Sequence, residues 1–123
     1  MYAERHAVTV TTDADGAGTG YTPVVTGNVL AIHYVKADFA DGVDFTITAE
    51  ATGESIWAQV NVNASASVVP RQATHSTAGV AALYAAAGVA VLAPVTVAAD
   101  RVKIAVASGG DTKSGTFMLI VGG

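Results

Sequence analysis

The chain has no cysteine and few charged residues. Without cysteine it can form no disulfide, no thiolate zinc site and no thiol nucleophile. Charged residues make up 13% of its 123 residues, whereas about 25% is usual for a soluble domain. Acidic residues outnumber basic ones by ten to six. This balance argues against binding to nucleic acid, because a protein that binds the phosphate backbone needs a basic face.

Long apolar runs are absent as well. No uninterrupted apolar stretch approaches the roughly 20 residues that a membrane helix needs. The first twenty residues contain acids and glycines, where a signal peptide would have an apolar stretch. We therefore expect a soluble protein that is made in the cytoplasm and has no membrane partner.

Apolar residues are nevertheless abundant, at 51% of the chain, and many of them are alanine and valine. The mean hydropathy is positive. A small monomer with so little charge would be poorly soluble unless more of its surface were covered. The composition therefore predicts an oligomer that is buried against other subunits.

Apolar and polar residues alternate in at least six segments of the chain. Because successive side chains of a strand point to opposite faces, this pattern predicts strands with one core face and one outer face. The 123 residues should form a single domain, an all-β antiparallel β-sandwich or jelly roll of about eight strands. The predicted core residues are Val8, Val10, Leu30, Ile32, Tyr34, Val43, Phe45, Ile47, Ile56, Ala58, Val60, Val89, Val91, Val95, Val97, Val102, Ile104, Val106, Phe117, Leu119 and Val121.

The connections between strands follow from turn residues. Val43–Ala49 and Ser55–Asn61 are predicted to pair as a hairpin, and Ser108–Ser114 is predicted to be a hairpin loop. Between Arg71 and Gly88 the alternation stops. The alanine-rich run Gly79–Ala87 inside this segment suits a short helix and a long loop equally well. The segment is long and apolar where a free loop should be polar, so we expect it to be a contact arm.

One acidic loop could in principle hold a cation. Asp38, Asp41 and Asp44 stand three residues apart, and such carboxylates suit calcium. Their spacing differs from that of an EF-hand loop, and Asp and Gly are ordinary turn residues. We expect no metal and no cofactor at this loop.

Catalytic residues are not indicated either. His6, His33 and His75 are far apart in the sequence, and none has a metal-ligand partner at a suitable spacing. Nothing resembles a nucleophile elbow or another local nucleophile signature. We therefore expect that the protein is not an enzyme.

Five residues are candidates for contact with a protein partner. Trp57 is predicted to point outward from its strand, and replacing it with a charged residue should reduce assembly more than folding. The last strand, Gly115–Val121, is apolar on both faces, so it should be covered on both sides. The candidate interface residues are His33, Trp57, Arg71, Tyr84 and Met118.

Strand-and-turn motifs are spread over nearly the whole chain, at Gly27–Val35, Asp44–Thr48, Thr52–Trp57, Pro70–Arg71, the loop through Tyr84, Asp100–Ile104, Gly109–Gly110 and Ser114–Gly115. In these motifs the chain resembles a family of small virion proteins of tailed bacteriophages. The resemblance implies a capsid decoration or cement protein that clamps neighbouring major capsid protein subunits. Such proteins are usually dimers or trimers of β-sandwiches within the virion, made in the host cytoplasm, and they carry no catalytic residues.

Two other functions remain open. The chain could be a tail-tube, head–tail connector or fibre-base subunit, for which ring symmetry would be the distinguishing feature. It could also be a carbohydrate-binding jelly roll. A lectin usually exposes several aromatic side chains beside a cation site, and here only Trp57 and the Asp38–Asp44 loop qualify.

Overall fold

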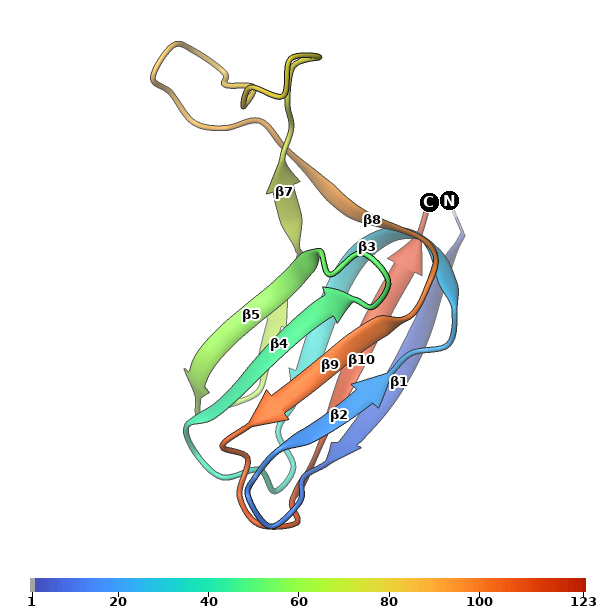
Figure 1. Ribbon diagram of the computed structural model, residues 1–123, viewed down its shortest axis with the longest axis vertical. Coiled ribbons are helices and arrows are strands. Elements are labelled where there is room, and N and C mark those ends of the chain that lie inside the picture. The colour runs from blue at the N-terminus through green and yellow to red at the C-terminus, as the bar shows by residue number, and fades with distance from the viewer. Residues whose placement is uncertain (1) are drawn as a thin grey trace.

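The computed structural model describes residues 2–123 and contains ten β-strands (Figure 1). The described residues include no helix, and hence none long and apolar enough to span a membrane. Residues 79–87, for which helix and loop were both possible, form a loop. The strands are β1 (Ala3–Thr11), β2 (Gly18–Tyr21), β3 (Val25–Val35), β4 (Val43–Ala49), β5 (Ser55–Val62), β6 (Ala66–Val68), β7 (Arg71–Ala73), β8 (Leu92–Asp100), β9 (Val102–Ala107) and β10 (Ser114–Gly122).

The strands form two antiparallel sheets that pack face to face. The six-stranded sheet has the order β1-β10-β3-β8-β7, and β6 also pairs with β3. The four-stranded sheet has the order β2-β9-β4-β5. The predicted all-β antiparallel sandwich is therefore confirmed. The strand number exceeds the expected eight, in part because β6 and β7 are only three residues long.

The core lies between the two sheets and has an aromatic centre. Tyr34 and Phe117 of the six-stranded sheet meet Phe45 of the four-stranded sheet, with ring centroids 5.1–5.2 Å apart. Alternation predicted these positions because each of the three residues lies on the inner face of a regular strand. The predicted core residues that are buried are Val8, Val10, Ile32, Tyr34, Val43, Phe45, Ile47, Ile56, Val95, Val97, Val102, Ile104, Val106, Phe117, Leu119 and Val121.

Five predicted core residues are wrong, and for three of them the cause is a β-bulge that shifts the alternation. In β5, Ile47 of β4 pairs with Trp57 while Thr48 pairs with Ser55, so Ile56 is an extra residue. Beyond this bulge the faces are exchanged. Ala58 is therefore exposed, and Val60 is 72% exposed. The third is Leu30, which is only half-buried because the register of β3 with β10 shifts beside it.

The other two wrong core positions are Val89 and Val91. The predicted strand was to begin at Val89, whereas β8 begins at Leu92. Val89 is therefore 74% exposed and Val91 is half-buried, because both lie in the loop before the strand.

One of the two predicted hairpins is correct. β4 and β5 pair as expected. The Ser108–Ser114 segment, in contrast, joins β9 to β10, which lie in different sheets. β9 pairs with β2 and β4, whereas β10 pairs with β1 and β3. A turn-rich segment has the same composition whether it closes a hairpin or crosses between sheets, so only the strand pairing distinguishes the two.

The two long sides of the sandwich differ. On one side β1 packs against β2, because two glycines of β2 leave no side chain between them. A Cβ atom at Gly18 would lie 2.6 Å from the carbonyl oxygen of Thr11, and one at Gly20 would lie 2.8 Å from Cγ1 of Val8. On the other side β5 ends its sheet, with no strand beyond it among residues 2–123. The sandwich is closed along β1 and β2 and open along β5.

Residues 71–94 form an arm that leaves the sandwich. Arg71 of β7 pairs with Pro94 of β8, and Ala73 pairs with Leu92, so these two strands make a short stalk. The loop between them continues beyond the end of the sandwich and points away from both sheets (Figure 1). The remainder of β8 pairs with β3 in the body of the protein.

Candidate interaction surface

The arm is held together by backbone hydrogen bonds but has no apolar core. The amide of Thr74 donates to the carbonyl of Val91 (2.8 Å), and the amide of Val91 donates to the carbonyl of Ala82 (2.9 Å). The amide of Ala82 donates in turn to the carbonyl of Thr74 (2.9 Å). Yet no residue from Arg71 to Leu92 is buried. Two paired strands without a packed face are at most marginally stable in water, so the arm lacks the burial that would offset its ordering.

Large apolar side chains are concentrated on this arm. They are exposed by 42% to 75% of their surface. Isolated exposed apolar residues are normal, but several close together mark an interaction site. The apolar residues of the segment thus lie on the surface, where a free loop would be polar. The residues are Val80, Leu83, Tyr84, Val89 and Leu92.

Charged residues are almost absent from the arm and from the open side of the sandwich. Between Glu54 and Asp100 the only residue with a formal charge is Arg71, and the only histidine is His75. This stretch includes β5, β6, β7, the whole arm and nearly all of β8. Residues 55–70, which carry β5 and β6, are called the uncharged side below. This uncharged stretch can be seen in the sequence. Its length indicates where the candidate interaction surface lies, which the low overall charge did not show.

The outer face of the six-stranded sheet is a second uncovered surface. Met118 on β10 pairs with His33 on β3 and with Ala7 on β1. His33 also shares a 2.7 Å hydrogen bond between its Nδ1 and the hydroxyl of Ser67 on β6. Met118 is half-buried by these neighbours. Within this chain, the inner face of β10 is covered as predicted. Its outer face is not covered by any other part of the chain.

Trp57 does not point outward as predicted. Because of the bulge at Ile56, it lies on the inner face of β5 and is half-buried. Its ring meets that of Phe45 edge to face, with 4.7 Å between centroids, and its Nε1 donates to the Oε1 of Gln59 (3.1 Å). Trp57 therefore lies at the rim of the core, beside the uncharged side.

The other predicted interface residues fall into two groups. Arg71 and Tyr84 both belong to the arm, the first exposed at its base and the second 75% exposed in its loop. His33 and Met118 are neighbours on the outer face of the six-stranded sheet. The five candidates therefore lie in three separate regions, namely the rim of the core, the arm and the outer face of the six-stranded sheet. They do not form a single patch.

The carboxylates of the acidic loop are engaged in different contacts. The carboxylate of Asp38 accepts the amide of Ser114 (2.6 Å), and that of Asp44 accepts the amide of Asn61 (2.9 Å). Asp41 forms an ion pair with Lys36 at 3.2 Å. Within residues 2–123 no group of three metal-ligating side chains comes together. Each of the three aspartates thus has its own partner within the chain.

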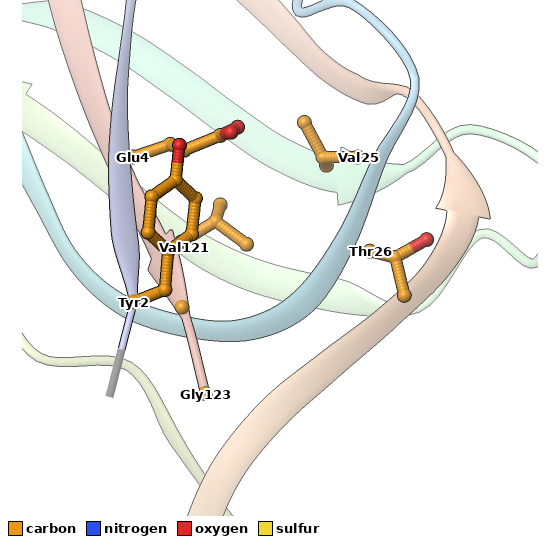
Figure 2. Close-up of a pocket in the computed structure, with 7 residues that line it drawn as sticks. Tyr2, Glu4, Val25, Thr26, Val121 and Gly123 are labelled. Atoms are coloured by element: carbon orange, nitrogen blue, oxygen red, sulfur yellow. The ribbon is translucent and has the colours of Figure 1, made fainter.

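A small open pocket lies near the last residues of β10 (Figure 2). Its volume is about 230 Å³, and its polar side chains are Tyr2, Glu4 and Thr26. The carboxylate of Glu4 lies 3.3 Å from Nε2 of His6, and Tyr2 is 76% exposed. Ligand sites in proteins are typically 300–1,000 Å³ and enclose most of the ligand. The pocket is therefore a weaker candidate than the arm.

The chain was also compared with known proteins. None of the family models, curated proteins or solved structures matches it. Its function is therefore inferred from its own residues and their arrangement.

Proposed function

We propose that this chain is a capsid decoration protein of a tailed bacteriophage, a non-catalytic subunit that stabilises the shell of major capsid protein by contact alone. The observation that carries the proposal is the coincidence of two features. The arm is apolar, exposed and without a core of its own. It also belongs to a long stretch in which Arg71 is the only formally charged residue.

The energetics favour a subunit that acts by burial. Covering apolar surface contributes about 25 cal/mol per Å², and charged groups that would have to be desolvated are almost absent from this stretch. A standard contact buries about 800 Å² on each partner. Such a contact, repeated at every symmetry-related position of a shell, would hold neighbouring capsid subunits together.

The remainder of the molecule suits the exposed side of a decoration subunit. All charged residues other than Arg71 lie outside residues 55–99, among them Asp13 and Asp15 in the β1–β2 loop and Asp111 and Lys113 in the β9–β10 loop. Charged residues on exposed loops favour the solubility of a protein. We infer that these loops face water while the arm and the outer sheet face are covered.

The arm also gives a reason to retain a second candidate. A projecting element suits a subunit of a ring, such as a tail tube or a head–tail connector. The carbohydrate-binding alternative has less support, because Trp57 packs on Phe45 and each aspartate of the acidic loop has a separate partner within the chain.

Locating the chain in purified phage particles by cryo-electron microscopy tests the proposal. We expect the sandwich on the outer surface of the shell, with the arm against neighbouring protein. A position in the tail tube or connector would replace the lead proposal by the second candidate. Absence of the chain from purified particles would overturn both.

A further inference from the structure

We propose that the arm of one copy packs on the uncharged side of a neighbouring copy, so that copies join head to tail into a closed ring. This inference rests on the proposed function, in which the protein acts by burial, and it assigns the partner of the arm. It assigns the arm to a contact between copies of the chain, and it leaves the outer face of the six-stranded sheet for contact with the shell.

The first step is that the arm is not covered by its own sandwich. It leaves the end of the body and points away from both sheets (Figure 1). None of the residues from Arg71 to Leu92 is buried. The residues that cover it must therefore belong to another molecule.

The second step is that the chain itself offers a matching surface. On the uncharged side, Val60 is 72% exposed and Val69 is 58% exposed. β5 is an edge strand, and it carries none of the lysines, glutamates or prolines that usually protect such edges. The bulge at Ile56 and the left-handed backbone of Asn61 (φ 55°) interrupt the edge. We therefore expect side-chain packing there, and no long added strand.

The third step is the distribution of charge over the chain. The chain has a net charge of −4 although Arg71 contributes a positive charge. Contacts through the acidic loops would bring like charges together, which opposes association. A contact between the arm and the uncharged side brings only Arg71 into the interface. A contact between two uncharged sides would bring in no charge at all, but it would leave the arm uncovered.

The fourth step is symmetry. The arm and the uncharged side are different surfaces, so a contact between them is heterologous. A heterologous contact either closes into a ring or continues as a filament. The contact assigned here closes into a ring. A ring of three copies agrees with the trimers expected of a decoration protein, and a larger ring agrees with the second candidate, so the position in the particle distinguishes the two functions.

Two aspartate variants and a mixture of them test this contact. Val80→Asp/Tyr84→Asp charges the arm, and Val60→Asp charges the uncharged side. Val24→Asp/Tyr2→Asp is the matched control, because Val24 is as exposed as Val80 (64%) and Tyr2 is about as exposed as Tyr84 (76% and 75%). Sedimentation velocity measures the oligomeric state, and thermal unfolding within a few degrees of the wild type verifies folding.

The expected result is a closed oligomer for the wild type and the control, and monomers for each of the other two variants. An equimolar mixture of the two monomers should form a one-to-one dimer, because one intact arm then meets one intact side. Monomers in the mixture, or a monomeric wild type, would overturn the proposal. A monomer that still decorates particles would leave the proposed function standing, whereas a ring that is absent from particles would refute the function and retain the contact.

Discussion

Trp57 on β5 meets Phe45 on β4 edge to face, with 4.7 Å between the ring centroids and 74° between the ring planes. This contact joins the edge of the four-stranded sheet to the aromatic centre of the core. It also changes what a substitution of Trp57 should do. The outward orientation predicted an effect mainly on assembly, whereas the observed contact predicts an effect on folding.

Trp57→Ala should lower the free energy of unfolding by about 1–3 kcal/mol, less than the 3–5 kcal/mol typical of a fully buried aromatic because Trp57 is only half-buried. Urea unfolding measures the change. Gln59→Ala is the control, since it removes the hydrogen bond to the indole and leaves the ring contact, and it should cost less than about 1 kcal/mol. Equal effects of the two variants would contradict the importance of the Phe45 contact.

The hydroxyl of Tyr34 is buried and has no hydrogen-bond partner in the structure. Tyr34→Phe removes this unpaired group and retains the packing with Phe45 and Phe117. The variant should therefore be at least as stable as the wild type at pH 7, with a gain of up to about 1–2 kcal/mol. A loss of more than about 1 kcal/mol in urea unfolding would indicate that the hydroxyl is hydrogen-bonded in solution.

The same residue predicts a pH dependence. Desolvation by burial raises the pKa of Tyr34 above its ordinary value of 10.0. As the pH rises above 10, the unfolded chain releases this proton while the folded chain retains it, so the stability of the folded state falls. Tyr34→Phe lacks this contribution. The wild type should therefore lose more stability than the variant between pH 8 and pH 11, as measured by urea unfolding; parallel losses would contradict the prediction.

Gly18 holds the closed side of the sandwich. A Cβ atom there would lie 2.6 Å from the carbonyl oxygen of Thr11, so Gly18→Ala must push β2 away from β1. We expect a loss of about 1–3 kcal/mol in unfolding free energy, typical of overpacking. Gly53→Ala is the comparison, because that site is open and only its positive φ of 73° opposes the substitution, at about 1 kcal/mol. A smaller loss at Gly18 than at Gly53 would show that the two strands separate easily.

Removing the loop of the arm should spare the fold. β7 and β8 are antiparallel, and Ala73 pairs with Leu92, so an Asn-Gly turn can replace residues 74–91. Because none of those residues is buried, the melting temperature should change by only a few degrees. Self-association, measured by sedimentation, should be lost. A shortened chain that fails to fold would show that the arm supports the sandwich.

The sequence by itself was sufficient for the fold class and for most of the core. Val43, Phe45 and Ile47 alternate on a regular strand, and all three are buried as predicted. Alternation works there because the side-chain period of a strand is two wherever no residue is inserted. The near absence of charge between Glu54 and Asp100 is equally a property of the sequence.

Only the tertiary structure decided where those residues lie. The bulge at Ile56 turned Trp57 inward and Val60 outward, and a bulge depends on the pairing with β4, which the local pattern does not contain. The crossing of β9 to β10 between sheets likewise depends on which strands pair. The projection of residues 71–94 from the sandwich is also a tertiary property, because an apolar loop could equally have folded back onto a sheet. Local sequence patterns indicate which residues prefer to be buried. The pairing of distant strands determines which apolar surfaces remain exposed and can contact a partner.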